Sequence, residues 1–243
     1  MEIHVGILGH SIEGAALCLR EYAISCTAKG IAAHPDVSLD CIAIEHSMDD
    51  WRAGRHEAVR TRLALSVDRL AAAGADFFAC PANTAHAALE SPGPPLAVPG
   101  LHIIEEVADA AARQGYLKVG VLGTAFTMAG DGYPLSLGRR GIEAVAPDPD
   151  DFDAVHRMIF TDLVHGIVSP QTVSAFTRVI DRLAGRGCDA VALACTEIPL
   201  AVNADTSPLP ILDSCRVLAE AAADVALQAR PLPHWRGGPA NAD

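Results

Sequence analysis

The sequence predicts an α/β fold of two pseudo-symmetric, doubly wound lobes, each with a parallel four-stranded sheet, and both sheets facing one cleft. Three observations predict it. Short apolar runs alternate with longer segments of helical spacing, which is typical of parallel sheets covered by helices on both faces. Two sequence patterns recur at nearly one offset. Half of the 243 residues are hydrophobic and 20% are charged, so the chain can bury a sizeable core.

The first half of the chain opens with a β-branched apolar run over 2–9 that ends in glycine, which predicts a strand, and a helix is expected from about 13 to 29. A second strand is expected over 39–45. Apolar residues at helical spacing predict a helix over 53–73. A third strand over 76–80 precedes a helix that starts near 84. The tract 91–100 is rich in proline and glycine and predicts a loop.

The second half repeats this alternation. After a helix over 101–114, strands are expected over 118–123 and 141–145, with a helix over 126–140 between them. Two helices, near 151–167 and 170–186, precede a strand over 189–194. A short strand over 210–212 and a helix from about 215 to 230 complete the pattern, and the polar tail 231–243 is predicted to be flexible.

An internal repeat supports the two lobes. VGILG at 5–9 returns as VGVLG at 119–123, and GAD at 74–76 returns as GCD at 187–189, so the offsets are 114 and 113 residues. Each GxD precedes an apolar strand and then a polar cluster. VGxLG is also a common strand ending, which is the alternative explanation. We expect lobes over 1–112 and 113–213, with the helix over 214–230 returning to the first lobe.

Charge and composition exclude several classes of function. The chain has 18 basic and 30 acidic side chains, a net charge of −12, which argues against a nucleic-acid partner. No apolar run approaches ~20 residues and no basic start precedes one, so neither a membrane partner nor secretion is expected. The predicted compartment is the cytoplasm. The seven cysteines fit no metal-binding spacing, so we expect reduced thiols and no metal.

Polar clusters follow corresponding strands of the two lobes. The offset of 113 pairs Ala82 with Cys195, Asn83 with Thr196, and Thr84 with Glu197. Ligands of parallel sheets bind beyond the carboxyl ends of the strands. Free backbone N–H groups at a strand-to-helix junction can hold a carboxylate, and such a position lowers the pKa of a thiol. The sequence therefore predicts a carboxylate site with a reactive Cys195.

Three segments, PANTAH (81–86), ACTEIPL (194–200) and LGTAFTM (122–128), resemble motifs of the aspartate/glutamate racemase superfamily, and the resemblance covers roughly residues 5–215. It implies two lobes around a cleft, no pyridoxal phosphate or other cofactor, no metal, a small amino-acid or carboxylate substrate and a homodimer. In typical members one thiol from each lobe flanks the α-carbon, one removing the α-proton and the other returning a proton on the opposite face.

This chain departs from the family pattern at the first thiol, which is replaced by Ala82. Cys195 matches the second thiol and is the expected catalytic residue. Cys80 lies two residues before Ala82, further back along the strand, and is expected to be buried. The first strand ends in Gly9-His10-Ser11 instead of the glycine-rich family sequence. His10 is therefore a candidate for the second proton donor, and Ser11 for a carboxylate ligand.

The remaining candidates are substrate-binding residues, each with a structural alternative. The resemblance assigns the carboxylate to Asn83, Thr84, Thr124, Thr127 and Thr196, whose side chains are equally suited to cap helices. Glu197 is expected to orient Cys195 or accept the substrate ammonium, or else to sit at a helix start. Arg52 and Arg55 lie near the position of the family's substrate arginine but are otherwise solvated charges, and His86 is expected to be structural.

The leading functional hypothesis is a cofactor-independent amino-acid racemase or epimerase that moves the α-proton through Cys195. Because Ala82 carries no proton, two alternatives stay open. One is a single-cysteine decarboxylase or isomerase of a related carboxylic acid, similar to arylmalonate decarboxylases. The other is a non-catalytic carboxylate-binding protein.

Overall fold

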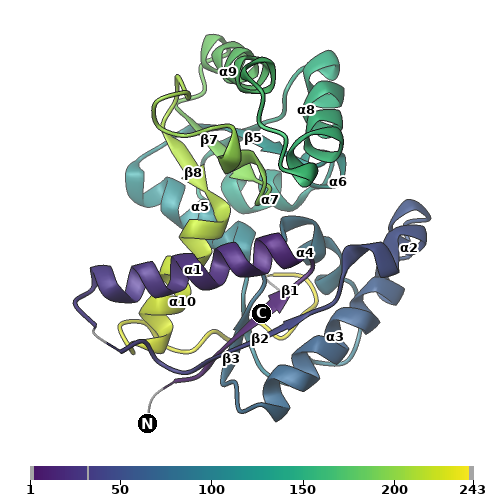
Figure 1. Cartoon of the computed structure of the whole chain (residues 1–243), viewed down its shortest axis with the longest axis vertical. Helices are drawn as coiled ribbons and strands as arrows, with labels where there is room; N and C mark the ends of the chain where they lie inside the picture. The colour runs from purple at the N-terminus through teal and green to yellow at the C-terminus, as the bar shows by residue number, and fades with distance from the viewer. Residues whose placement is uncertain (1–2, 32, 241–243) are drawn as a thin grey trace. The chain divides into compact units, whose positions relative to one another are not determined.

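The computed structural model describes residues 3–31 and 33–240, and within it the chain forms two compact units (Figure 1). The first unit runs through Glu106 and resumes at Cys215, and the second comprises Val107–Ser214. The division falls within helix α5 (Ile103–Gln114) and after the first residue of helix α10 (Ser214–Ala226). Most of α10 therefore belongs to the first unit.

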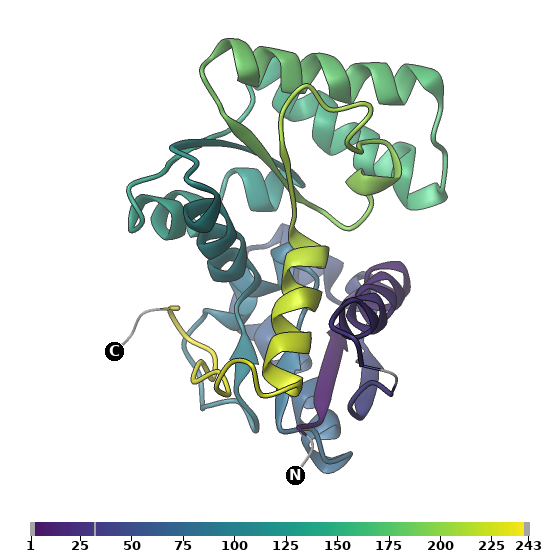
Figure 2. The same ribbon diagram turned by 90° about the vertical axis from the view of Figure 1, so that its left-hand side faces the viewer.

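The first unit is built on a parallel sheet of order β2-β1-β3-β4. Its strands are β1 (Val5–Gly9), β2 (Val37–Cys41), β3 (Phe77–Ala79) and β4 (Gly100–Leu101). Its helices before α5 are α1 (Ile12–Ala28), α2 (Met48–Arg52), α3 (His56–Ala72) and α4 (Asn83–Leu89). Helix α10 packs beside α1 (Figure 2), where Lys29 pairs with Asp224 at 2.7 Å and Arg216 with Glu21 at 3.2 Å.

The second unit repeats the same topology, with a parallel sheet of order β6-β5-β7-β8. Its strands are β5 (Lys118–Gly123), β6 (Glu143–Val145), β7 (Ala190–Ala194) and β8 (Ile211–Asp213). Its helices after α5 are α6 (Ala125–Met128), α7 (Gly132–Gly138), α8 (Pro149–Thr161) and α9 (Pro170–Gly185). The predicted α/β class with two parallel four-stranded sheets is confirmed.

The repeated GxD motif has a structural cause that is the same in both units. Gly74 and Gly187 end α3 and α9 with φ values of +96° and +85°, which glycine adopts without steric cost. The aspartates that follow hold the start of the neighbouring strand: Asp76 accepts the His4 N–H at 2.8 Å, and Asp189 accepts the Leu117 N–H at 2.8 Å. The motif therefore ends a helix and aligns the central strand of each sheet.

The structure differs from the predicted elements in several places. The strand expected over 39–45 is β2, which ends at Cys41, and the chain forms a 3₁₀ turn over Ile44–Ser47 instead. Residues 129–131 form a bend, so the single helix expected over 126–140 is divided into α6 and α7. The predicted loop over 91–100 ends in β4, which pairs with β3 through Phe78 opposite Gly100 and Ala79 opposite Leu101. Two residues are too few to show strand periodicity, so no sequence pattern indicates this strand.

The tail that the sequence predicts to be flexible makes defined contacts over the part that the structure describes, which ends at Ala240. The Trp235 carbonyl accepts the Gly100 N–H at 2.8 Å, and the Arg236 carbonyl accepts the Leu96 N–H at 2.9 Å. The Trp235 ring stacks on His86, with centroids 5.7 Å apart and planes 13° apart. A polar composition does not reveal contacts of this kind. Residues 241–243 lie outside the described residues.

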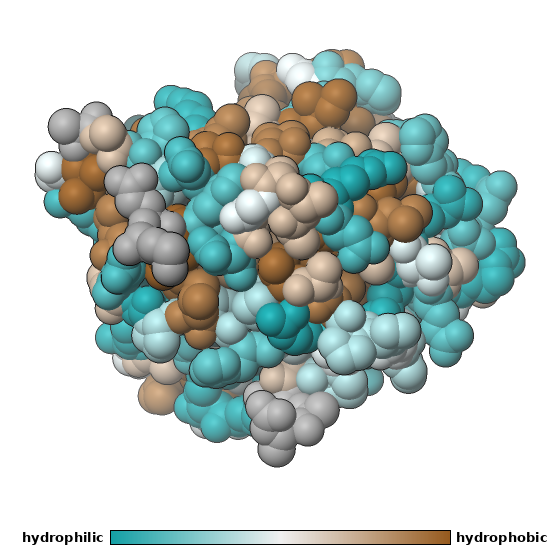
Figure 3. All heavy atoms as spheres, turned by 90° about the horizontal axis from the view of Figure 1, so that it is seen from below, coloured by the Kyte–Doolittle hydropathy of each residue, from teal (hydrophilic) through white to brown (hydrophobic). Residues whose placement is uncertain are grey.

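Exposed hydrophobic side chains come from several elements, and Val164, Ile167 and Val168 lie close together in the chain. Among the larger exposed ones are Ile12, Leu65 and Leu117, from different elements. On the face seen in Figure 3, hydrophobic side chains lie among hydrophilic ones. Within residues 3–31 and 33–240, no helix combines the length and the hydropathy needed to cross a membrane.

Candidate functional site

The carboxyl end of β7 carries a thiol–carboxylate pair. Cys195 follows the strand directly, and its Sγ–H donates to Glu197 Oε2 at 2.9 Å. Both side chains are half-buried. The chain then enters a short 3₁₀ turn, Ile198–Leu200, while Ser214 Oγ donates to the Leu193 carbonyl at 2.8 Å and fixes the end of the strand. A proton shared between sulfur and carboxylate is a group that can both accept and return a proton.

The pKa of Cys195 runs against the sequence expectation. Removal of water raises it well above the usual thiol range, and the negative charge of Glu197 raises it further. Hydrogen bonds from the backbone N–H groups of Glu197 and Thr196 lower the pKa, but by less than burial and Glu197 raise it. The expected low-pKa thiolate is therefore wrong for this state of the site. Cys195 is held as a neutral thiol beside a carboxylate.

The carboxyl end of β5 carries two nearly buried threonines. Thr124 caps α6: its Oγ1 accepts the Thr127 N–H at 3.4 Å and lies 3.3 Å from Thr127 Oγ1. Gly123 permits this turn to approach β7, since a Cβ there would lie 2.9 Å from the Ala194 carbonyl oxygen. The structure thus places Thr124, Thr127 and Cys195 at the carboxyl edge of one sheet. Capping and ligand binding are compatible, because a hydroxyl that accepts one bond can still donate another.

The sequence interpretation missed His156 on α8. Its Nδ1 accepts the Ala125 N–H at 3.1 Å, at the start of the α6 turn. Its ring contacts Phe126 and Phe160, with centroid distances of 6.4 and 4.9 Å. No motif identifies this residue, because α8 and α6 are separated by about twenty residues and meet only in the folded unit.

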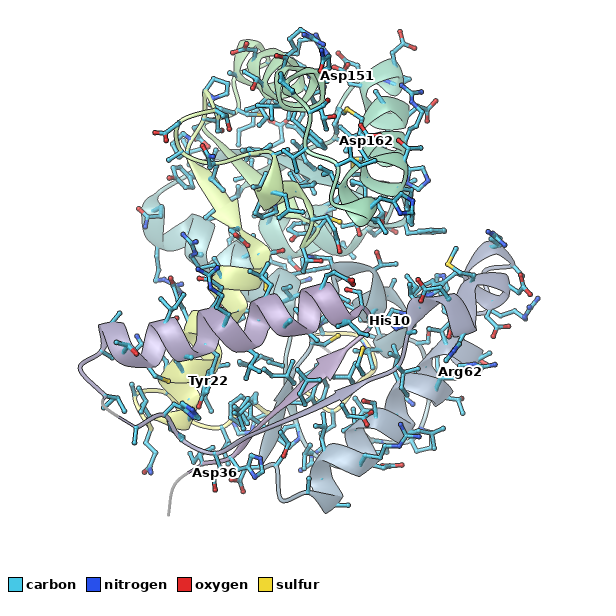
Figure 4. The ribbon with its side chains drawn as sticks, in the orientation of Figure 1. His10, Tyr22, Asp36, Arg62, Asp151 and Asp162 are labelled. Carbon is cyan, nitrogen blue, oxygen red and sulfur yellow. The ribbon has the colours of Figure 1, made fainter. Side chains whose placement is uncertain are left out.

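His10 lies where β1 meets α1, at the carboxyl edge of the first sheet (Figure 4). It is 2% exposed, and both ring nitrogens are engaged. Trp51 Nε1–H donates to Nε2 at 3.3 Å, so the ring proton is on Nδ1, which donates to the Ile42 carbonyl at 2.9 Å. Burial lowers the pKa of His10. This neutral, fully bonded imidazole does not fit the hypothesis of a second proton donor, and it holds β1 against α2 instead.

Three other candidate residues belong to the first unit: Ser11, which caps a helix, and Arg52 and Arg55, which form ion pairs. Ser11 caps α1 by accepting the Gly14 N–H at 3.1 Å, which matches the role of Thr124 in the second unit. Arg52 is 69% exposed on its side chain and lies 3.6 Å from Asp49, an ordinary surface ion pair. Arg55 likewise pairs with Asp50 at 2.8 Å. Neither arginine is oriented by a buried partner.

The carboxyl end of β3 leads into α4 through Ala82. Ala82 is the N-cap residue and supplies no side-chain hydrogen bond, so Asn83 and Thr84 occupy the first two helical positions and are not N-caps. Asn83 is 5% exposed, and Ala82 and Thr84 are half-buried. In the second unit, Thr196 is also half-buried, one residue after Cys195. These positions remain candidate carboxylate ligands.

His86 and Cys80 are buried residues next to this segment in the chain. His86 is fully buried: Ile103 N–H donates to its Nε2 at 3.2 Å, so its Nδ1–H donates to the Ala82 carbonyl at 3.1 Å. Burial lowers the pKa of His86 to about 3. Cys80 is also fully buried, which raises its pKa to about 12. Both residues are structural here.

The described residues, 3–31 and 33–240, contain no group of three or more His, Cys, Asp or Glu side chains arranged to hold a metal ion.

Comparison with known proteins shows relatives over most of the chain. The family model for Asp/Glu/Hydantoin racemases matches residues 7–222. The broad specificity amino-acid racemase RacX of Bacillus subtilis is 28% identical over 168 residues, which are 68% of this chain and 71% of RacX. A structure of a candidate Asp/Glu racemase from Yersinia pestis is 31% identical with a TM-score of 0.81, covering 93% of this chain and all of that one.

A second structure, of an aspartate racemase homologue from Pyrococcus horikoshii, is 26% identical, with a TM-score of 0.76 and the same coverage. Because the family model spans far more than half of the chain and agrees with the duplicated fold, the chain belongs to the Asp/Glu/Hydantoin racemase family.

Proposed function

We propose that this protein is a cofactor-independent amino-acid racemase or epimerase in which Cys195 transfers the α-proton. The observation that carries the proposal is the 2.9 Å hydrogen bond from Cys195 Sγ–H to Glu197 Oε2 at the carboxyl end of β7. Family membership supports racemase chemistry, and the ACTEIPL segment (194–200) resembles the family motif that contains the second thiol, which would be Cys195. The combination favours proton transfer over a purely structural cysteine.

The proposed substrate carboxylate is bound by hydroxyl and amide donors at the strand ends. We assign Asn83 and Thr84 from the first unit and Thr124 and Thr196 from the second, with Ser11 and Thr127 beside them. Thr124 and Ser11 each accept a backbone N–H, which fixes the position of the hydroxyl oxygen at the strand end, and a hydroxyl group can both accept and donate. Such donors stabilise the charge that develops on the carboxylate as the α-proton leaves.

The proton transfer needs both members of the pair. Glu197 accepts the thiol proton, the resulting Cys195 thiolate removes the α-proton, and the negative charge passes to the enolate of the substrate carboxylate. Glu197 is then a protonated acid, and Cys195 a thiol that can return a proton to the same face, whereas inversion requires that a water molecule protonate the opposite face. The high thiol pKa makes a neutral thiol beside an ionised Glu197 the resting state, so the proton that Cys195 gives up passes to Glu197 and not to solvent.

One-face chemistry is the second candidate function, favoured by two observations in the first unit. Ala82 bears a methyl group, which moves no proton, and both nitrogens of His10 are occupied. An enzyme with one acid–base group can protonate an enolate from one side, as in decarboxylation or one-way isomerisation. A non-catalytic carboxylate-binding protein would need neither Cys195 nor Glu197 to ionise.

Proton exchange in D2O tests these alternatives. Amino acids are incubated with the protein, and loss of the α-proton is followed by NMR while chiral chromatography follows inversion. Exchange with inversion supports racemisation, and exchange with retention supports one-face chemistry. We expect Cys195→Ala to abolish exchange. Full activity in that variant would overturn the proposal, and binding without exchange would support the non-catalytic alternative.

Ala82→Cys tests the role of the missing thiol. Ala82 follows β3 as Cys195 follows β7, so the new thiol takes the corresponding place in the first unit. We expect inversion to increase relative to exchange, because a second acid–base group is supplied. Ala87→Cys, on the half-buried face of α4, is a control that adds a thiol elsewhere. An equal effect of both variants would contradict the proposed correspondence.

Assembly and location are further proposals from the family resemblance. We propose a homodimer that acts in the cytoplasm on a small carboxylate. Light scattering measures the assembly directly, since each chain has a mass of 25.3 kDa. A mass of one chain across the working concentration range would contradict the dimer.

A further inference from the structure

Three rings gather beside the α6 turn of the second unit. We propose that Phe126, His156 and Phe160 form the side-chain subsite of the enzyme, and that its preferred substrate is an α-amino acid with an uncharged, apolar side chain. This inference rests on the proposed function and specifies the substrate class. It concerns residues that the family motifs leave unassigned.

The position of the rings follows from the turn that contains Thr124 and Thr127. Phe126 lies between these threonines on α6, directly after β5. His156 on α8 is tied to the same turn by the 3.1 Å bond from the Ala125 N–H. A substrate whose carboxylate is held by Thr124 would therefore have these rings within reach of its side chain.

The rings form one connected apolar wall. His156 meets Phe160 at 4.9 Å between centroids with planes 66° apart, and meets Phe126 at 6.4 Å with planes 87° apart. These are edge-to-face arrangements, which aromatic rings prefer. Phe126 and His156 are half-buried, and Phe160 is 37% exposed, so part of the wall is open to a ligand.

The wall is uncharged in this state. Because His156 Nδ1 accepts a backbone N–H, its proton lies on Nε2 and the imidazole is neutral. Aromatic and neutral imidazole surfaces provide contact for methyl, methylene and phenyl groups. They provide no counter-charge for a second carboxylate, such as that of aspartate or glutamate.

Charges on the same helices point to the same substrate class. Helices α6 and α8 together carry one lysine or arginine, Arg157, which is exposed. Its charge acts on Asp162, whose pKa is lowered first by hydrogen bonds from Thr161 and Thr172 and then by Arg157. Asp150 and Asp151 occupy the first turn of α8, where Asp151 is paired with Arg182 of α9. A distal carboxylate at the rings would therefore meet apolar surface with no counter-charge beside it, whereas an apolar side chain would gain apolar contact.

The test compares kcat/KM for α-proton exchange with phenylalanine, leucine, alanine and aspartate. We expect phenylalanine and leucine to exceed aspartate by at least about tenfold. Phe160→Ala should lower the ratio of kcat/KM for phenylalanine to kcat/KM for alanine by about tenfold or more. Phe160→Arg should raise the value for aspartate. Leu117→Ala is the matched control, since Leu117 is 71% exposed but precedes β5 at the opposite edge of the sheet.

The outcomes separate this inference from the proposed function. Exchange that depends on Cys195 but favours aspartate, or a phenylalanine rate that Phe160→Ala leaves unchanged, overturns the apolar subsite alone. Absence of exchange with every amino acid overturns the proposed function. The subsite is then tested by calorimetric measurement of binding. Phenylalanine should bind more tightly than aspartate, and this preference should disappear in Phe160→Ala but not in Leu117→Ala. Any other ranking overturns the subsite.

Discussion

Replacing the carboxylate of Glu197 by an amide should change two properties of Cys195 in opposite directions. Glu197→Gln keeps the shape of the side chain but removes the charge that lies 2.9 Å from Sγ. At an effective dielectric constant of about 20, two unit charges at that distance repel by roughly 6 kcal/mol. A thiolate and an ionised Glu197 therefore hardly coexist, and the pair carries one negative charge.

Two assays follow the change. Loss of the charge lowers the thiol pKa, so alkylation of Cys195 by iodoacetamide at pH 7.5, read by peptide mass spectrometry, should become at least about tenfold faster. Loss of the proton acceptor should slow α-proton exchange by roughly 10²-fold or more. Cys41, a half-buried thiol at the end of β2 in the first unit, is the internal control and should react at an unchanged rate.

The reasoning would be refuted if Cys195 alkylation slowed or stayed constant in Glu197→Gln, because the carboxylate would then not set the thiol charge. Exchange at the wild-type rate would separately show that Glu197 is not the proton acceptor. Glu220→Gln, on α10, removes an equal charge outside the site and should alter neither measurement.

Three further predictions concern the framework of the site. His86 has a pKa of about 3 in the folded protein and about 6.5 when unfolded, so the unfolded chain binds a proton that the folded protein excludes between these values. The free energy of unfolding should thus fall by up to roughly 1.4 kcal/mol per pH unit from about pH 6 down to pH 4. Urea titrations at several pH values measure this dependence, and His86→Gln should make it weaker. If His86→Gln left the dependence unchanged, groups other than His86 would be its cause. Trp235→Ala should destabilise the protein by about 2–3 kcal/mol, because the ring packs on Phe78 and His86, with Trp235→Phe losing less; a mobile tail would give no loss. Gly123→Ala should cost about 1–3 kcal/mol, since its Cβ would lie 2.9 Å from the Ala194 carbonyl oxygen. Gly138→Ala, whose Cβ meets no atom within 4 Å, should be neutral or slightly stabilising, and similar effects of both substitutions would refute the steric argument.

Much of the fold was predictable because its causes are local in the sequence. Gly74 and Gly187 each end a helix. Asp76 and Asp189 each bind the start of the central strand. The three-residue GxD motif therefore indicates a helix, the strand that follows it and the neighbouring strand. Two copies of it at one offset predicted the duplicated sheets. The strand-end clusters at Asn83 and Cys195 were predictable for the same reason, since a side chain after a buried parallel strand lies at the carboxyl edge.

Other features depend on contacts between distant segments and left no local signal. The tail was predicted to be flexible, yet Trp235 anchors it on His86, some 150 residues earlier in the chain. His156 was missed because only the folded unit brings α8 to the α6 turn. Trp51 and Ile42 occupy both nitrogens of His10, which a sequence motif cannot show and which argues against the proton-donor hypothesis.

The sequence by itself determined the α/β class, the duplication, the family resemblance and the identity of the residue that departs from it, Ala82. These depend on residue type and spacing alone. Only the tertiary structure decided the protonation states: Cys195 is a neutral thiol beside Glu197, and His10 and His86 are neutral, structural imidazoles. The physical reason is that a pKa is set by burial and by neighbouring charges and hydrogen bonds, which exist only after the chain has folded.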